Sequence, residues 1–276
     1  MEAHRLREPI ELKGVGVHSG AGVSLVVGPG EDGIVFRRAD TGGTVRADWR
    51  NVAATRLQTV VQENGAAVKT IEHLMSALAA FGVRDATVSI DGPEVPIMDG
   101  SAAPFVEAIR PAIEPAPAGE AIRVMRPVAV RSRDAFAAFL PFDGRRFDVC
   151  IDFPDAIIGV QRLAFDLTAE GFAREIAPAR TFGRLRDVEM LHRKGFAKGA
   201  SLENAVAVDG ATVANPEGLR FPDEFVRHKL LDAIGDTALA GKPILGLYRS
   251  HKGGHRLNYE LLRALFADAE NVQIVA

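Results

Sequence analysis

A histidine and an aspartate set four residues apart are the first residues in this sequence whose spacing could do chemistry. They are His228 and Asp232 in the stretch "EFVRHKLLDAIGD". On a helix, such a pair has its Cβ atoms roughly 6 Å apart, close enough for an imidazole nitrogen and a carboxylate oxygen to bind one ion. The apolar residues of the stretch gather on the opposite side, as expected for a face that packs on a core. The alternative is a solvated pair or a weak ion pair, so the metal interpretation depends on the rest of the chain.

A third ligand is available from His73 in "KTIEHLMSAL". Two histidines and one aspartate leave a fourth position for water, which is the pattern of a catalytic zinc site. Structural sites usually have four ligands and are rich in cysteine, and this chain has only Cys150. Adjacent helical residues point about 100° apart, so Glu72 can lie beside the metal without binding it. Glu72 is therefore predicted to act as a general base toward a metal-activated water.

Three other polar residues fit the same chemistry, and each has an ordinary alternative. His255 follows a glycine pair at a loop–helix junction in "HKGGHRLNYELL". It could donate a proton if Asp236 offsets the helix dipole, which disfavours an imidazolium; otherwise it is a loop histidine without a role. Thr181 in "PARTFGRLRDV" could donate to an oxyanion or cap a helix. Lys229 could hold phosphate or be a solvated lysine.

The elements that position these residues form two similar runs. The stretch from Arg110 to Val124, "RPAIEPAPAGEAIRV", is rich in proline and is interpreted as a linker. On each side of it, short strands are followed by a helix, a strand and a helix, which favours α+β layers over a doubly wound parallel sheet. We predict an α+β fold of two similar domains, residues 1–115 and 122–276. The expected helices span residues 70–83, 103–110, 185–195, 224–236 and 258–269.

Composition narrows the class of protein. The 276 residues are 47% hydrophobic and 25% charged, which is typical of a soluble globular protein. A net charge of −3 without a basic run gives no reason to expect a nucleic-acid partner. The single cysteine fits a reducing compartment. The N-terminus lacks a signal-peptide pattern, and no segment approaches the ~18 apolar residues needed to cross a bilayer. We predict a cytoplasmic protein with no transmembrane segment and at most peripheral membrane contact.

Taken together, the motifs resemble one family, the zinc-dependent UDP-3-O-acyl-N-acetylglucosamine deacetylases of lipid A and lipopolysaccharide biosynthesis in Gram-negative bacteria. The resemblance runs in order through "GVGVHSG", "KTIEHLMSAL", "PEVPIMDGSAAPF", "ARTFG", "RFPDEFVRHKLLDAIGD" and "GHRLN". It implies one Zn²⁺ per chain, held by His73, His228 and Asp232. The roles that it implies for other residues are general base (Glu72), general acid (His255) with its supporting carboxylate (Asp236), oxyanion donor (Thr181), contact near the substrate phosphates (Lys229), a position near the active site (His18) and lining of an acyl-chain passage (Leu185 and Val188).

The same resemblance implies a fold and a reaction. The two domains would pack as a β-α-α-β sandwich with zinc in the cleft between them. The monomeric enzyme, a hydrolase, would release acetate from the 2-acetamido group of a small-molecule, lipid-linked UDP-sugar. The alternatives are a related amidohydrolase for another N-acetylated sugar and a non-catalytic module that binds zinc or a sugar nucleotide. The apolar stripe of Leu185, Val188 and Leu191 could also pack on the core, and iron could replace zinc.

Overall fold

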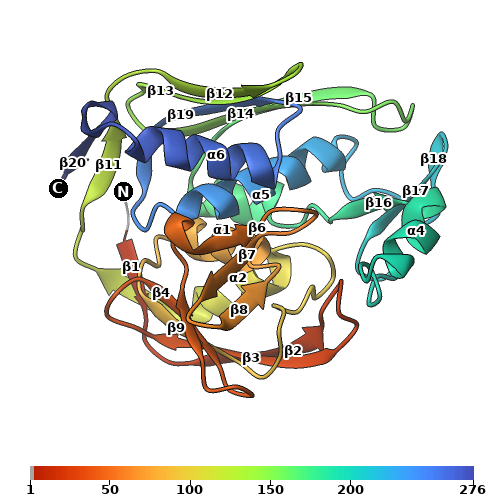
Figure 1. The fold of residues 1–276 in the computed structure, drawn as a ribbon, viewed down its shortest axis with the longest axis horizontal. Coiled ribbons are helices and arrows are strands. Elements are labelled where there is room, and N and C mark those ends of the chain that lie inside the picture. The colour runs from red at the N-terminus through yellow and green to blue at the C-terminus, as the bar shows by residue number, and fades with distance from the viewer. Residues whose placement is uncertain (1–2) are drawn as a thin grey trace.

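Four layers follow one another in the order sheet, helices, helices, sheet in the computed structural model, which describes residues 3–276 (Figure 1). Residues 3–116, here called the N-terminal half, supply one outer sheet and two helices. Residues 121–276, the C-terminal half, supply the other sheet and the helices that face the first pair. The predicted α+β sandwich is confirmed. The domain limits 1–115 and 122–276 remain predictions, and residues 1–2 lie outside the described part.

The outer sheet of the N-terminal half has five strands in the order β2-β3-β9-β4-β5, and only β4 and β9 pair in parallel. Alternate residues of β3, namely Val23, Leu25 and Val27, are buried because one face of the sheet packs on the helices. A small antiparallel sheet, β6-β7-β8, precedes the first helix. The elements are β2 (Ile10–Val15), β3 (Gly22–Pro29), β4 (Ile34–Arg38), β5 (Thr44–Arg46), η1 (Trp49–Asn51), β6 (Val52–Ala54), β7 (Val60–Glu63), β8 (Ala66–Lys69), α1 (Glu72–Ala80), β9 (Ala86–Ile90) and α2 (Ala103–Ala112).

The sheet of the C-terminal half is built around β19, which pairs with β13, β14 and β11. Strand β12 extends the sheet beyond β13, β15 extends it beyond β14, and β20 extends it beyond β11. In Figure 1 this sheet lies above α5 and α6. The elements are β11 (Ala121–Val124), β12 (Val128–Ser132), β13 (Ala135–Leu140), β14 (Arg145–Asp152), β15 (Val160–Asp166), α3 (Ala169–Gly171), the short π-helix η2 (Phe172–Ile176), α5 (Glu224–Ala238), β19 (Ile244–His251), α6 (His255–Phe266), η4 (Ala269–Asn271) and β20 (Val272–Val275).

A projection between η2 and α5 stands out from the layers at the right of Figure 1. It carries a small sheet in which β17 pairs with both β16 and β18. A short helical segment connects β16 to the rest of the projection. The elements are β16 (Phe182–Arg184), η3 (Leu185–Asp187), α4 (Val188–Arg193), β17 (Val206–Asp209) and β18 (Thr212–Val213).

The prediction that residues 110–124 form a linker is wrong for most of the stretch, because helix and strand residues occupy it. Helix α2 continues through Pro111 to Ala112, and the next four residues form β10 (Ile113–Ala116), which pairs with β1 (Ala3–Leu6). Strand β11 then begins at residue 121, so only residues 117–120 connect the halves without regular structure. Prolines are tolerated in this two-stranded ribbon because an edge strand need not donate every backbone hydrogen bond.

Helices α1 and α5 pack against each other at the centre of the sandwich. Gly235 makes this possible, because a Cβ atom at that position would lie 2.0 Å from the carbonyl oxygen of Glu72. Helix α5 is consequently buried on both sides: Leu230 contacts the core, and His228 and Asp232 are only 3% exposed. Among the described residues, no helix combines the length and apolar character that crossing a bilayer requires.

Candidate metal centre and active-site cleft

Three potential metal ligands meet where α1 and α5 cross. His73 comes from α1, and His228 and Asp232 come from α5. Asp232 Oδ1 lies 3.4 Å from His228 Nε2 and 3.8 Å from His73 Nε2, and one ligand atom from each residue lies within 4.8 Å of the others. The alternative of a solvated pair is wrong, because all three side chains are buried. This group can hold one divalent ion.

The protonation of the three residues fits metal binding. His228 Nδ1 lies 3.1 Å from the carbonyl oxygen of Ala179, so Nδ1 carries the proton and Nε2 keeps its lone pair. Burial, with the nearby His228, lowers the pKa of His73 to about 3, and burial also lowers the pKa of His228. Burial alone would raise the pKa of Asp232, but Lys229 and His228 hold it below its usual range. The site thus offers two neutral imidazoles and a carboxylate, the forms in which these groups bind metal.

Glu72 begins α1 immediately beside these ligands. Its side chain is buried: Oε2 accepts a hydrogen bond of 3.1 Å from the Thr59 backbone N–H, and Oε1 lies 3.9 Å from His255 Nε2. Burial raises the pKa of Glu72 to about 7, although the charge of His255 acts in the opposite direction. A carboxylate with a pKa near neutrality can both accept and release a proton at physiological pH.

His255 is the first residue of α6, as the sequence predicted for a loop–helix junction. Its Nδ1 lies 2.8 Å from Asp236 Oδ2, so the predicted pairing is present. Burial alone would lower the pKa of His255, but the charge of Asp236 and its hydrogen bond raise it to about 9. The imidazole is therefore protonated at neutral pH, with Nε2 directed toward Glu72 and Asp232.

Three buried residues that sequence reasoning missed hold Asp236 in place. The Thr59 hydroxyl donates to Asp236 Oδ1 (2.6 Å), and the Asn258 amide donates to Oδ2 (2.8 Å). The Tyr248 hydroxyl donates in turn to Asn258 Oδ1 (2.5 Å). Asn258 could have been found, because it lies three residues after His255 and so shares its helix face. Thr59 and Tyr248 carry no such signal, because they come from distant strands and loops.

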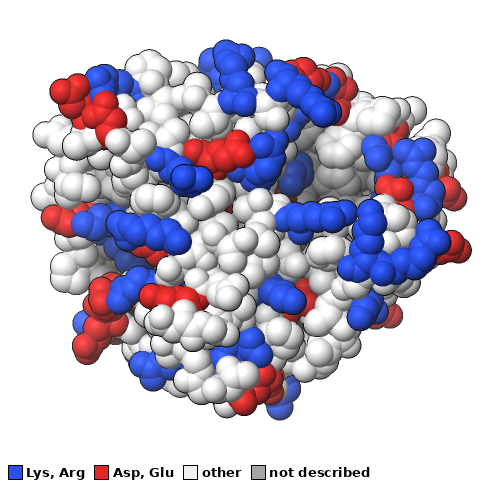
Figure 2. Space-filling model, in the orientation of Figure 1, with Lys and Arg blue, Asp and Glu red and all other residues white. Residues whose placement is uncertain are grey.

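A cleft of about 440 Å³ opens over this group of residues. Thr181 and Lys229 both line it, together with Phe182 and the loop before α6. Lys229 Nζ donates to Asp232 Oδ2 at 2.6 Å, so in this structure the lysine is paired with one of the three candidate metal ligands. Thr181 precedes β16 and caps no helix. Figure 2 shows a hollow between the upper sheet and the projection, with Lys and Arg side chains along its rim.

Three further residues predicted to belong to the site, His18, Leu185 and Val188, are not among the residues that line this cleft. His18 Nδ1 accepts a hydrogen bond of 3.2 Å from the Ala197 backbone N–H, and its ring packs edge-on against Phe196, with 5.2 Å between ring centroids. Burial lowers the pKa of His18. Leu185 is 39% exposed and Val188 is half-buried, so neither belongs to the buried core. Their segment begins directly after β16, whose first residue, Phe182, is part of the cleft wall.

Carboxylates of the turn-rich segment "DGPEVPIMDGSAAPF" hold loops in place. The fully buried Glu94 accepts hydrogen bonds from the backbone N–H groups of His18 and Ser19 and from the Thr70 hydroxyl. It therefore ties the glycine-rich loop around His18 to the strand end that precedes α1. Asp99 accepts from Ser101 in the same way.

The fold and the site define an α+β sandwich protein in which two buried histidines and an aspartate could hold a metal ion, beside a buried glutamate and an imidazole that faces it. Residues 3–267 match the family described as UDP-3-O-acyl N-acetylglycosamine deacetylase. Proteins named UDP-3-O-acyl-N-acetylglucosamine deacetylase from Brucella ovis, Brucella abortus and Brucella melitensis are each 43% identical to this chain over 273 residues, covering 96% of both sequences. The chain belongs to this deacetylase family and is an enzyme, as its motifs predicted.

Proposed function

We propose that the protein hydrolyses the 2-acetamido group of UDP-3-O-acyl-N-acetylglucosamine and releases acetate, a step of lipid A biosynthesis. One observation carries the proposal: the group of His73, His228 and Asp232 lies in the same cleft as a buried carboxylate and a charged imidazole. A site that only bound its ligand would need neither a base nor an acid. The relatives' names supply the substrate.

The ligand set and its neutral imidazoles favour zinc as the metal, although the same donors also accept iron. A bound Zn²⁺ would lower the pKa of a water molecule and polarise the acetamido carbonyl. Glu72 is placed to take a proton from such a water molecule, because it adjoins the candidate ligand His73 and its Oε1 lies 3.9 Å from His255 Nε2 across the site.

The residues of the chain then have complementary tasks. Glu72 takes a proton from a water molecule while the oxygen of that water attacks the carbonyl carbon of the acetamido group. The Thr181 hydroxyl donates to the oxyanion that develops. His255 gives its proton to the nitrogen as the C–N bond breaks, so that acetate and a free amine leave. Asp236 holds the imidazole in the orientation and the charge state for that donation. The proton received by Glu72 restores His255 for the next turnover.

The surroundings of the cleft suit a substrate that is both charged and lipidic. The positive charges of Lys229 and of the basic rim in Figure 2 favour binding of a nucleoside diphosphate group. The partly exposed stripe containing Leu185 and Val188 begins next to the cleft wall, and it could bury an acyl chain at about 0.8 kcal/mol per methylene before ordering costs. We place the acyl-chain passage along this stripe.

Two substrates separate this proposal from its alternatives. Zinc-loaded protein is incubated with UDP-3-O-acyl-N-acetylglucosamine or with the same sugar nucleotide lacking the acyl chain, and acetate and free amine are measured. We expect equimolar acetate and amine from the acylated substrate, and a kcat/KM lower by several orders of magnitude without the chain. Binding without acetate release would indicate a binding module. Equal efficiency on both substrates would indicate an amidohydrolase for unacylated sugars.

A further inference from the structure

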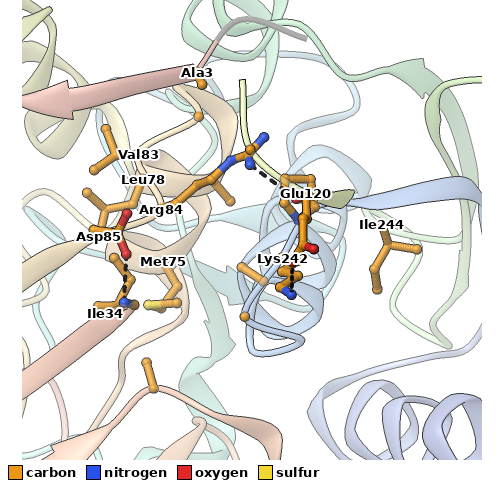
Figure 3. Close-up of a pocket in the computed structure, with 18 of the residues that line it drawn as sticks. Ala3, Ile34, Met75, Leu78, Val83, Arg84, Asp85, Glu120, Lys242 and Ile244 are labelled. Carbon is orange, nitrogen blue, oxygen red and sulfur yellow. Dashed lines mark hydrogen bonds and ion pairs between the residues drawn. The ribbon is translucent and has the colours of Figure 1, made fainter. Parts of the chain in front are cut away.

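An ion pair that the proposed mechanism does not use is buried directly beside Thr181. Arg180 is 1% exposed, and its partner Glu224, the first residue of α5, is fully buried. By contrast, Lys242 and Glu120, which pair at the larger cavity between the two halves, have side chains that are 41% and 57% exposed (Figure 3). Exposed pairs contribute little to stability, and burying two charges is costly even when they attract each other. The contacts of the buried pair indicate what else it does.

The carboxylate of Glu224 is surrounded by donors. Its Oε1 accepts from the backbone N–H (3.0 Å) and the Nε (2.9 Å) of Arg180. Its Oε2 accepts from Arg180 Nη2 (3.2 Å) and from the Arg220 backbone N–H (2.6 Å). The other bonds of the guanidinium go to Glu217 Oε1 (2.5 Å) and to the carbonyl oxygen of Gly218 (2.7 Å). A buried network whose members are bonded in this way is rigid, so the pair fixes the backbone at Arg180.

Two groups of the active site lie on either side of that fixed backbone. The carbonyl oxygen of Ala179 lies 3.1 Å from His228 Nδ1, and this contact leaves Nε2 of the candidate ligand free for a metal. Thr181, the candidate oxyanion donor, follows Arg180 and lines the cleft. Arg180 therefore separates, by one residue each, a group that orients a metal ligand from a group that meets the substrate.

Both groups must keep a fixed position relative to α5, because two candidate metal ligands lie on that helix. The backbone N–H of Thr181 donates to the Gly100 carbonyl oxygen at 2.7 Å, which ties it to the N-terminal half and not to α5. The hydrogen bonds that join residues 179–181 to α5 are those of Glu224 and, one turn later, His228. A displacement of about 1 Å at a reacting group can lower the rate about 10²-fold, so this link bears directly on catalysis.

We propose that Arg180 and Glu224 form a positioning pair for the active site. The pair holds the Thr181 hydroxyl where the oxyanion develops, and it holds the Ala179 carbonyl against His228. Neither charged residue touches the substrate. The effect through Thr181 rests on the proposed deacetylase reaction, whereas the effect on His228 concerns metal binding alone.

Substitution of either charged residue, with and without the Thr181 hydroxyl, tests the first effect. Arg180→Lys keeps the charge but loses the forked set of donors, and Glu224→Gln keeps the size of the side chain without its charge. In zinc-loaded protein that circular dichroism shows to be folded, we expect either change to lower kcat at least ~10-fold and to leave KM nearly unchanged. In a Thr181→Val background the same changes should lower kcat less than ~3-fold further, because the hydroxyl that they position is already absent.

Metal release provides a second reading, which does not depend on the substrate. The rate at which zinc passes to excess EDTA is measured for each full-length variant without substrate. Because the Ala179 carbonyl orients His228, zinc should leave Arg180→Lys and Glu224→Gln at least ~10-fold faster than it leaves the unchanged protein.

The matched control is Arg38→Lys. The Arg38 side chain is 12% exposed, and it bonds to both carboxylate oxygens of Asp40 and to the Ala67 carbonyl oxygen, in the N-terminal half. This variant should keep its kcat and its rate of metal release, and equal losses in it would overturn the proposal. So would an unchanged kcat or unchanged metal release in both folded variants of the pair, or an equal fall in kcat with and without the Thr181 hydroxyl. An unchanged enzyme that releases no acetate would contradict the proposed reaction instead, and metal release would still decide on the pair.

Discussion

Replacing Gly235 by alanine tests whether the close approach of α1 and α5 sets the geometry of the active site. A Cβ atom at this position would lie 2.0 Å from the oxygen, 2.8 Å from the carbonyl carbon and 3.1 Å from the Cα of Glu72. These are backbone atoms, so no rotamer change can relieve the contact. Since non-bonded atoms prefer about 3.5 Å, the two helices must separate locally by roughly 1.5 Å.

Two effects of Gly235→Ala oppose each other. Alanine favours a helix over glycine by about 1 kcal/mol. Overpacking a buried contact costs about 1–3 kcal/mol, and a clash with a rigid backbone belongs at the upper end. We therefore expect a net loss of about 1–2 kcal/mol in the free energy of unfolding. The separation also moves Glu72 and His73 away from His228, and a displacement of about 1 Å can lower the rate about 10²-fold.

Urea unfolding and acetate release measure the two consequences. The matched control is Gly22→Ala, because a Cβ atom at Gly22 meets no atom within 4 Å. That variant should keep both the unfolding midpoint and kcat. If Gly235→Ala unfolds at the same or a higher urea concentration and turns over normally, the α1–α5 contact does not hold the site together.

The other predictions concern protonation, metal and lipid. Asp236→Asn removes the negative charge that raises the pKa of His255 to about 9, so the falling limb of the kcat/KM–pH profile should move to lower pH; an unmoved limb would contradict the acid role. His228→Ala should lower the metal content well below about one ion per chain in elemental analysis, whereas His192→Ala, at an exposed histidine on α4, should not; equal content in both would remove the metal assignment. Val188→Asp should reduce kcat/KM far more for the acylated than for the unacylated substrate, and equal losses would place the acyl chain elsewhere.

Two of the three candidate ligands could be paired from the sequence because they follow a local rule. The i, i+4 spacing of His228 and Asp232 places two ligands on one face of any helix. The burial of that face could not be predicted, because it depends on α1, which is distant in sequence and comes closest where Gly235 has no side chain. The apolar positions on the other face gave an ordinary amphipathic pattern, although α5 is buried on both sides.

The parts of the site that escaped prediction depend on tertiary contacts. Thr59 reaches Asp236 across 177 positions of sequence, and no motif relates the two. Prolines between residues 110 and 117 suggested a linker, but β1 supplies a partner strand that outweighs their local preference.

Acetate release by Glu72→Gln, with the metal content of the same sample, tests the proposed chemistry most directly. Glutamine preserves the size of the side chain and its place beside the metal ligands but cannot take a proton from water. We predict that the variant retains about one zinc ion per chain and that its kcat falls at least ~10²-fold, the usual scale for loss of a general base. A variant that keeps its metal and releases acetate at close to the rate of the unchanged enzyme would contradict the role of Glu72 and the mechanism built on it.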